Sequence, residues 1–371
     1  MTEEIMAKIL TNSEKEALLI LDQSPKVGAK TLKKVIHHYK NDLTKVLVDS
    51  KENLSHFFLG APLEGILEAR KLKLDKRVYE KFNITPVFFG ENVYSKLLAE
   101  IFDPPVILYC RGNIELLNTI SVAVVGSRKY TGYAKSALEK IIPPLTSADI
   151  TIISGLALGV DSMAHYLTLE NSGKTIGVLG CGVDEIYPTS NRQLGERILN
   201  NGGLIISEFP PGTPPLKQNF PLRNRIIAGL ASGTFVVEAR HDSGSLITAG
   251  LANEYGREIF AVPGNIDSFA SEGTNELIKQ GAKMVTGAAD ILSELDIAFS
   301  VGKTSIIVPE NIEEEKIFKA IELEPLEVDK ISKLTKLDIV TVNSLMSVFE
   351  ISGKVEKVGG GFRLRGKMGA K

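Results

Sequence analysis

The segment from Lys217 to Arg225, KQNFPLRNR, combines cations, side-chain amides and one aromatic ring, and it contains no acid. Its candidate nucleic-acid contacts are Lys217, Asn219, Phe220, Arg223, Asn224 and Arg225. The cations are suited to phosphates, and Phe220 offers a flat face on which an unpaired base can stack. The alternative is the start of a helix with a buried Phe220 and solvated arginines. On their own, these residues support both interpretations equally.

The stretch SEFPPGTPPL comes directly before this segment and has prolines at positions 210, 211, 214 and 215. Proline fixes its own φ angle and lacks an amide hydrogen, so the stretch cannot form a regular helix or strand. We expect it to run extended over the surface and to present Lys217–Arg225 beside the strand ends. Pro221 is well placed to begin the next helix.

Between about residues 84 and 296, short apolar runs alternate with helical periods, which predicts an α/β domain. Most runs are β-branched and apolar throughout, as in parallel strands covered on both faces. The predicted strands are residues 106–110, 121–125, 151–154, 175–180, 203–207, 234–239 and 258–262, and the helices begin near Tyr133, Gly159, Arg192, Pro221, Leu246 and Asn275. A doubly wound, mostly parallel sheet binds its ligand at the carboxyl ends of the strands, so the loops there are candidate sites.

Two of these loops, GSRKYTG and ARHDSGSLITAG, place small and polar residues at a helix amino end. Their candidate phosphate contacts are Gly126, Ser127, Arg128, Ser243, Gly244 and Ser245. Free backbone amides, hydroxyls and the charged donors of Arg128 all suit an oxyanion. The first loop is not a dinucleotide fingerprint, because Arg128 stands where G-x-G-x-x-G requires a glycine. The alternatives are helix capping by the serines and a salt bridge of Arg128.

The loop SGLALGVDSMAH places Asp161 and His165 one helical turn apart. As an acid/base pair they would indicate catalysis. We favour a structural role, in which Asp161 lies at a helix start and His165 makes an internal hydrogen bond. The loop GCGVDEIYP predicts a tight turn instead of a nucleotide-binding loop, since Glu185 stands at the position of the third glycine.

Length and composition indicate an ordinary globular protein: 371 residues suggest two to three domains, and 43% hydrophobic content is enough for a large core. With 43 Lys and Arg against 45 Asp and Glu, nucleic-acid binding must come from clustered cations. Cys110 and Cys181 fit neither a zinc spacing nor a disulfide framework, and we expect no metal or cofactor. The acidic start and the lack of a long apolar run predict a cytoplasmic protein without a membrane span.

The flanking regions predict two smaller modules. Residues 1–80 have apolar positions at three-to-four spacing and predict a helical module. Within it, SPKVGAKTLKKVI resembles half of a helix-hairpin-helix element, in which Gly28 permits a turn whose amides approach a phosphate. Ala29 replaces the second glycine, so we favour a structural or partner-docking role.

Residues 312–367 have the winged-helix order of three short helices and a hairpin. The would-be recognition helix at 341–350 carries no Lys or Arg, so weak DNA contact and protein docking both stay open. The basic residues of the wing and tail are Lys354, Lys357, Arg363, Arg365, Lys367 and Lys371.

From about Asp103 to Leu295, the chain resembles the DNA-processing protein A family, also called DprA or Smf, in the order and spacing of its motifs. The matching motifs are GSRKYTG, SGLALGVDSMAH, GCGVDEIYP, SEFPPGTPP, KQNFPLRNR, SGSLITAG, VPG and SEGTNELIKQGA. The resemblance implies an extended Rossmann-like domain, at residues 84–296, that binds and protects single-stranded DNA. It further implies a homodimer that loads the RecA recombinase during natural transformation and performs no catalysis.

The same resemblance implies where the DNA pocket lies. It falls on Arg128, on Lys217 and Phe220, and on the cluster Arg223–Arg225, with the SGS loop lining the same pocket. These are the loops that the residue types had already indicated.

Two other classes of protein are alternatives. A nucleoside-monophosphate N-glycosidase on the related fold would carry a P-G-G-x-G-T-x-x-E loop with a catalytic glutamate, and the corresponding RHDSGSLIT lacks that residue. A winged-helix transcription regulator with a ligand-sensing α/β domain would bind a defined duplex site tightly. The uncharged helix at 341–350 argues against the second alternative.

Overall fold

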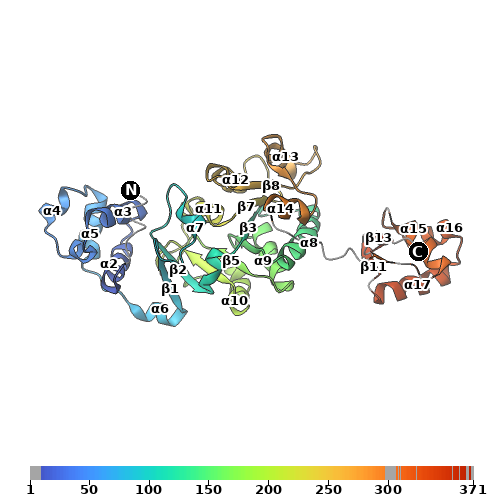
Figure 1. The fold of residues 1–371 in the computed structure, drawn as a ribbon, viewed down its shortest axis with the longest axis horizontal. Coiled ribbons are helices and arrows are strands. Elements are labelled where there is room, and N and C mark those ends of the chain that lie inside the picture. Colours follow the sequence, from blue (N-terminus) through green and yellow to red (C-terminus); the bar gives the residue numbers. More distant parts are fainter. Residues whose placement is uncertain are drawn as a thin grey trace. The chain divides into compact units, whose positions relative to one another are not determined.

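The computed structural model describes residues 10–296, 306–307, 309, 311–322, 324–352, 354–358, 360–364 and 367–368. The chain divides into two compact units, Met1–Ala298 and Phe299–Lys371 (Figure 1).

The first unit is built on a nine-stranded sheet with the order β1-β2-β6-β5-β4-β3-β7-β8-β9. The strands are β1 (Ile84–Phe88), β2 (Ile107–Gly112), β3 (Ser121–Val125), β4 (Thr151–Ser154), β5 (Thr175–Val178), β6 (Leu204–Ser207), β7 (Gly233–Val236), β8 (Glu258–Ala261) and β9 (Lys283–Met284). From β6 to β9 all neighbours are parallel, whereas β2 is antiparallel to both β1 and β6. The predicted doubly wound, mostly parallel sheet is therefore confirmed.

The strand order reverses at β3, which lies between β4 and β7. Chain connections run outward from β3 in both directions, so the loops after β3 and β7 diverge and leave room between them at the carboxyl edge. The sequence did not predict β1 or β9. The strand at β2 was predicted, but its antiparallel pairing was not, because an apolar run does not reveal strand direction.

Two groups of helices cover the sheet (Figure 1). In one group α9 (Val160–Glu170) contacts α8 (Gly132–Ser147) and α10 (Arg192–Asn200), and α8 contacts α14 (Ala288–Glu294). In the other, α11 (Asn219–Leu230) contacts α7 (Lys96–Ala99) and α12 (Gly244–Glu254), while α13 (Glu272–Lys279) packs on β8. The apolar residues of α11 share a buried cluster with alternate residues of β3, including Ala123 and Val125. This packing sets α11 against the middle of the sheet.

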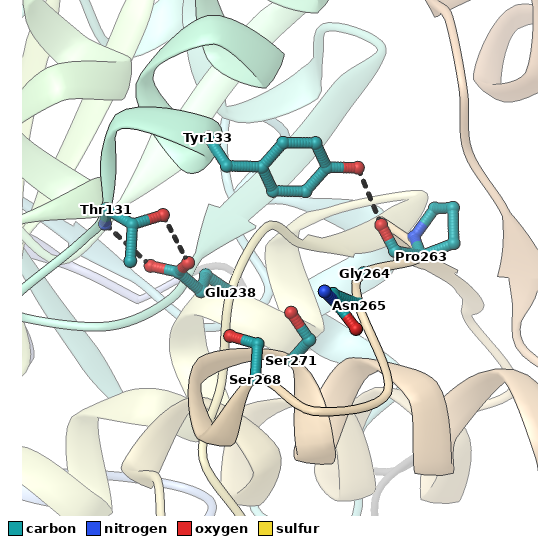
Figure 2. A pocket seen from close by; sticks show the side chains of 8 residues that line it. All are labelled: Thr131, Tyr133, Glu238, Pro263, Gly264, Asn265, Ser268 and Ser271. Carbon is teal, nitrogen blue, oxygen red and sulfur yellow. Dashed lines mark hydrogen bonds between the residues drawn. The ribbon is translucent and has the colours of Figure 1, made fainter.

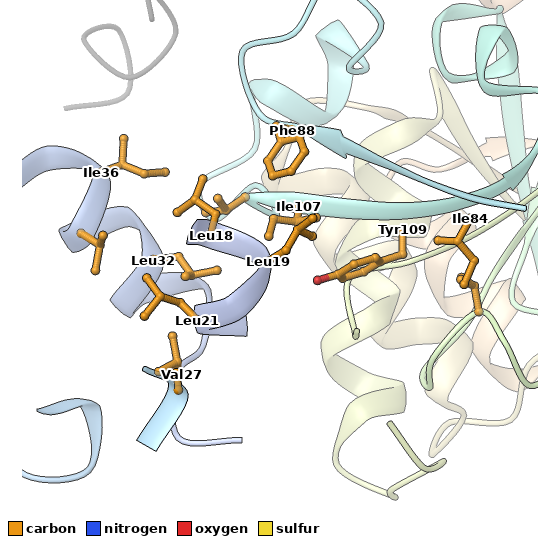
Figure 3. Packing of buried hydrophobic residues seen from close by; sticks show 14 of the residues in the cluster. Leu18, Leu19, Leu21, Val27, Leu32, Ile36, Ile84, Phe88, Ile107 and Tyr109 are labelled. Atoms are coloured by element: carbon orange, nitrogen blue, oxygen red, sulfur yellow. The ribbon is translucent and has the colours of Figure 1, made fainter. Parts of the chain in front are cut away.

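The amino-terminal helices share a buried core with β1 and β2. They are α2 (Asn12–Asp22), α3 (Ala29–His38), η1 (Leu43–Leu47), α4 (Lys51–Ser55), α5 (Ala61–Ala69) and α6 (Lys76–Phe82). Leu18 and Leu19 of α2 lie near Ile107 and Tyr109 of β2 in this cluster (Figure 3). The Tyr109 hydroxyl donates a hydrogen bond of 2.7 Å to Asp22. The helical module, predicted as residues 1–80, is thus packed onto the sheet within one compact unit.

The second unit is a winged helix, as the sequence predicted. Its elements are α15 (Ile312–Ile321), α16 (Val328–Thr335), α17 (Ile339–Ile351) and the antiparallel hairpin of β11 (Val355–Val358) and β12 (Gly361–Leu364), with β10 (Ile306–Ile307) parallel to β13 (Lys367–Met368). Phe318 and Phe349 pack in its core, with ring centroids 4.9 Å apart. Of the predicted basic residues of wing and tail, Lys354 lies 3.5 Å from Glu314, while Arg365 and Lys371 lie outside the described residues.

Asp22, at the junction of helices and sheet, predicts a pH-dependent stability. Burial raises the pKa of Asp22 from 3.8 to about 7, and the nearby Glu208 carboxylate adds to the effect while the Tyr109 hydrogen bond opposes it. Between these two pH values the unfolded chain has released the proton and the folded protein has not, so the free energy of unfolding falls as pH rises. Asn keeps an acceptor for Tyr109 without a charge. Asp22→Asn should therefore show a flatter pH dependence in urea unfolding; parallel curves for both proteins would contradict this origin.

Candidate nucleic-acid interface

A groove of about 680 Å³ lies at the carboxyl edge of the sheet, at the point where the strand order reverses. Its walls come from the loops after β3, β4, β5 and β7 and from the start of α11. Nine of the predicted contacts line it: Gly126, Arg128, Lys217, Phe220, Arg223, Asn224, Ser243, Gly244 and Ser245. Loops that are far apart in the sequence therefore meet around one groove, because parallel strands end at the same edge.

The amino end of α11 forms one wall of the groove. The helix begins at Asn219, so the segment from Lys217 to Arg225 is mostly helical, and Pro221 lies in its first turn. The proline-rich stretch before it was expected to run extended, but residues 210–213 form a turn: Thr213 N donates to the carbonyl oxygen of Pro210, and Gly212 N donates to Asp184 Oδ1 at 2.9 Å. This stretch has no regular secondary structure, as predicted. It is tied to the loop after β5 by the Asp184 contact.

Phe220 is half-buried and forms an aromatic pair with Tyr187, which was not among the predicted contacts. The two ring centroids are 5.6 Å apart at an interplanar angle of 44°, and both rings line the groove. A Cβ at position 180 would lie 3.1 Å from the Phe220 ring, so the absence of a side chain at Gly180 makes room for the ring. The feature of the sequence that could have identified Tyr187 is an aromatic residue in a loop after a strand.

Arg128 and Lys217 are exposed cations at the groove. Within the described ranges of the chain, neither side chain has a hydrogen-bond or ion-pair partner. The loop that carries Arg128 is fixed through its backbone. Ser127 N donates to the Glu238 carbonyl oxygen at 2.8 Å, and Val160 N donates to the Ser127 carbonyl oxygen at 3.1 Å. Both charges are thus available to an anion, and one of them stands on a restrained backbone.

The SGS loop begins α12 at the opposite wall. Ser243 is the N-cap residue, and its hydroxyl accepts a hydrogen bond of 3.4 Å from Ser245 N. The two hydroxyls lie 2.7 Å apart. Gly244 is exposed, and a Cβ added there would meet nothing within 4 Å. The capping role that was the alternative for these serines is present, and the open backbone at Gly244 still faces the groove.

Arg223 is buried, with 5% of its surface exposed, although the sequence suggested a cation for phosphates. Its Nη1 donates to the carbonyl oxygens of Gly155 and Val178, the latter through a very short contact. Burial lowers the pKa of Arg223 to about 10, and the Asp161 carboxylate opposes that shift. Gly155 leaves space for the guanidinium, because a Cβ there would collide with it. Arg223 therefore joins α11 to the ends of β4 and β5 instead of presenting its charge to solvent.

Three further predicted contacts lie away from the groove lining. Arg225 forms an ion pair with Glu208, and each side chain is only 11% exposed. Asn219 is buried with 5% exposed. The Ser127 hydroxyl stays within its own loop, where it donates to the carbonyl oxygen of Lys129 at 2.9 Å. The cations of KQNFPLRNR thus divide into the exposed Lys217 and two arginines that hold the protein together.

Asp161 and His165 have the structural roles that we favoured. Asp161 Oδ2 accepts a hydrogen bond of 3.1 Å from Gly155 N at the start of α9. His165 Nδ1 lies 2.7 Å from the Thr175 hydroxyl in the core. Burial, and secondarily the charge of Arg223, lower the pKa of His165 to about 3. A neutral, enclosed imidazole of this kind does not exchange protons with a ligand near neutral pH.

A shallower recess of about 440 Å³ lies beside the groove, between α8 and the loop after β8 (Figure 2). Its acid, Glu238, accepts hydrogen bonds from Thr131 N at 2.9 Å and from the Thr131 hydroxyl at 2.7 Å. The Tyr133 hydroxyl donates to the Pro263 carbonyl oxygen at 2.6 Å. Each oxygen of the Glu238 carboxylate is thus engaged by Thr131, which orients it as a structural acceptor.

In the part of the chain that the structure describes, no group of three or more His, Cys, Asp or Glu side chains is arranged to hold a metal ion. None of the described helices has both the length and the apolar character that a bilayer crossing requires.

A Rossmann-like domain with an aromatic and cationic groove at its strand ends, followed by a winged helix, defines the class of this protein. Residues 85–296 match the family described as DNA recombination-mediator protein A, and residues 305–361 match the DprA winged helix domain. The chain belongs to the DNA recombination-mediator protein A family.

Individual relatives agree with this assignment. The DNA processing protein DprA of Streptococcus pneumoniae is 45% identical over 223 residues, which are 60% of this chain and 78% of that protein. Protein Smf of Synechocystis is 32% identical over 400 aligned residues, covering 94% of this chain and 98% of that protein.

Solved structures show the same fold. The X-ray structure of DNA processing protein A from Streptococcus pneumoniae has a TM-score of 0.66 at 37% identity, covering 79% of this chain and 100% of that chain. A structure of DNA processing protein A from Helicobacter pylori has a TM-score of 0.53 at 34% identity, covering 58% of this chain and 98% of that chain. That structure concerns the protein's single-stranded DNA binding mode.

The burial of Arg223 leads to a prediction about stability. Arg223→Ala leaves two carbonyl oxygens and the Asp161 carboxylate without their buried cation, and it should lower the free energy of unfolding by about 3 kcal/mol. Lys217→Ala, a change of an exposed cation in the same segment, should alter it by less than about 0.5 kcal/mol. Urea unfolding of both variants tests the assignment. Equal, small effects would mean that Arg223 is not structural.

Proposed function

We propose that this chain is a non-catalytic single-stranded DNA-binding recombination mediator, which protects incoming DNA and loads the RecA recombinase during natural transformation. The observation that carries the proposal is the groove at the strand ends, where the half-buried Phe220 ring and the exposed Tyr187 ring lie beside the exposed Arg128 and Lys217. The single-stranded DNA binding described for the related Helicobacter pylori protein supports the same ligand.

In the proposed complex, Arg128 and Lys217 hold phosphates and Phe220 stacks on a base. Bases in a duplex have no free face, so a stacking platform selects single strands. The amino end of α12 at Gly244 adds backbone amides suited to a further phosphate. Asn224, half-buried at the groove, adds an amide for hydrogen bonds to the strand. Contacts of this kind give affinity without strong sequence choice.

We infer that the protein acts as a homodimer in the cytoplasm and contacts RecA; membership of the recombination-mediator family supports these inferences. The alternatives have less support. A glycosidase needs a free acid, and each oxygen of Glu238 is engaged by Thr131. A duplex-binding regulator is disfavoured because α17 carries neither Lys nor Arg.

Two substitutions separate stacking from charge. Phe220→Ala should weaken binding of a fluorescent oligothymidine by about fivefold to hundredfold, with little change in salt dependence, since stacking contributes about 1 to 3 kcal/mol per base. Arg128→Ala should reduce the slope of log affinity against log salt by about 0.7 for each lost phosphate contact. Fluorescence anisotropy at several salt concentrations measures both.

Controls for this pair come from exposed residues outside the groove lining. Phe102→Ala removes a phenylalanine that is 96% exposed, and Lys51→Ala removes an exposed cation on α4. Both should bind like the unmodified protein. Unchanged affinity in Phe220→Ala and Arg128→Ala together would reject the proposed groove.

Loading of RecA is tested by a separate measurement. On single strands coated with single-strand-binding protein, this protein should shorten the lag before RecA begins DNA-dependent ATP hydrolysis. Phe220→Ala should require a higher protein concentration for the same effect, because it acts through DNA affinity. A lag that the unmodified protein does not shorten at any concentration would contradict recombinase loading while leaving DNA binding untouched.

A further inference from the structure

A second cavity, of about 730 Å³, lies between the amino-terminal helices and the segment that leads into α11, all within the first compact unit. The end of α2 and the start of α3 form one side, and residues 208–219 form the other. Apolar walls are provided by Val27, Leu32, Val106 and Phe209. The proposed DNA groove does not account for this space.

Three buried polar groups of residues that line this cavity have no hydrogen-bond partner in the described part of the chain. They are Gln23 Nε2, Ser24 Oγ and Asn219 Nδ2. Ser24 is 2% exposed and Asn219 is 5% exposed, so solvent does not readily satisfy them. A buried polar group without a partner costs about 1 to 3 kcal/mol, and native proteins contain few of them. Three such groups around one cavity are available to a polar ligand.

Two carboxylates complement these donors. Asp22 and Glu208 line the same cavity, and each uses one oxygen within the protein, on Tyr109 and on Arg225 respectively. No hydrogen bond to the second oxygen of either carboxylate is found in the ranges that the structure describes. The cavity therefore presents amide and hydroxyl donors together with carboxylate acceptors, between apolar walls.

The amino end of α3 opens on the same space. Gly28 is its N-cap residue and provides no side-chain cap, so the first amides of this ten-residue helix have no partner from a capping side chain. A Cβ added at Gly28 would meet nothing within 4 Å, so the backbone there is open to a ligand. Such a helix end suits a phosphate.

We propose that this cavity binds a nucleotide, with its base among Gln23, Ser24, Asn219 and the carboxylates and its phosphate at the start of α3. A base presents donors and acceptors along one planar edge and apolar faces on both sides, which matches the cavity's polar groups and walls. The nucleotide is either free or part of a bound single strand. Only the second source rests on the proposed function.

The position of the cavity couples it to the DNA groove. Leu216, Gln218 and Asn219 line the cavity, while Lys217 and Phe220 line the groove. One short segment therefore separates the two spaces. A nucleotide held on one side restrains the residues that contact the strand on the other.

Calorimetric titration of the full chain with each of the four 5′-deoxynucleoside monophosphates tests the proposal. The unmodified protein should bind at least one of them saturably, at millimolar affinity or tighter. Gly28→Leu places a side chain at the cavity wall, and Gly28 has extended backbone angles that any residue adopts (φ −105°, ψ 179°), so the protein should fold and bind at least tenfold more weakly. Gln23→Ala should also weaken binding, because it removes an orphan donor without breaking any hydrogen bond of its amide nitrogen.

Gly287→Leu is the matched control. Gly287 is likewise an extended N-cap glycine with open space around its Cβ position, but it begins α14 and does not line the cavity. This variant should bind nucleotide like the unmodified protein, and thermal unfolding of both leucine variants should show the same small loss of stability.

A further titration on protein saturated with oligothymidine distinguishes the sources. Retained nucleotide affinity identifies a free ligand, whereas displacement by the oligonucleotide, with weaker oligonucleotide binding in Gly28→Leu, identifies a nucleotide of the strand. Absence of saturable binding for all four nucleotides, with unchanged oligonucleotide affinity in Gly28→Leu, would overturn the proposal. That result would leave the effects of Phe220→Ala intact, so it is distinguishable from failure of the DNA groove.

Discussion

The guanidinium of Arg223 connects the parts of the protein that form the groove. It reaches from α11 beneath the ends of β4 and β5 and donates to the carbonyl oxygens of Gly155 and Val178. A buried cation is costly unless hydrogen bonds and opposite charge surround it, and here Asp161 provides the charge. Phe220 lies in the first turn of the same helix and Lys217 just before its N-cap residue, so the anchoring of α11 by Arg223 contributes to where both lie.

This anchoring separates the cations into buried ones with a structural role and exposed ones that are available to anions. Arg223 and Arg225 are little exposed and bonded within the protein, so they set the geometry of the groove instead of presenting their charge to solvent. When an exposed charge on a restrained backbone, such as Arg128, contacts an anion, little further backbone entropy is lost. A chain without net positive charge can therefore bind a polyanion through a local surface, provided that the fold brings separate loops to one edge.

Much of the fold was predictable from local pattern. The seven predicted strands and the helices between them are present, because β-branched apolar runs and helical periods are properties of short segments. The edge strands β1 and β9 escaped prediction: β1 contains Thr85 and Pro86, and β9 is two residues long. Strand direction at β2 depends on its neighbours in space, which the local pattern does not contain.

The candidate site was predictable in location but less so in detail. The loops were indicated by residue type and by their place after strands, yet nothing in KQNFPLRNR distinguishes an arginine that points outward from one that points into the sheet. Arg223 and Asn219 are buried through tertiary contacts alone. The same reason applies to Tyr187, whose pairing with Phe220 joins two loops, and to the cavity at Gly28, which exists only because the helical module packs against the sheet.

We expect an unpaired base to stack on the aromatic pair of Tyr187 and Phe220, beside the start of α11. Photocrosslinking tests it most directly: a single strand with 5-iododeoxyuridine is bound to the full chain, irradiated, and the crosslinked residue identified by mass spectrometry. We expect crosslinks at Phe220 or Tyr187 that are abolished by excess unlabelled single strand and retained in the presence of duplex. Crosslinks confined to the winged helix or to residues outside the groove would contradict it.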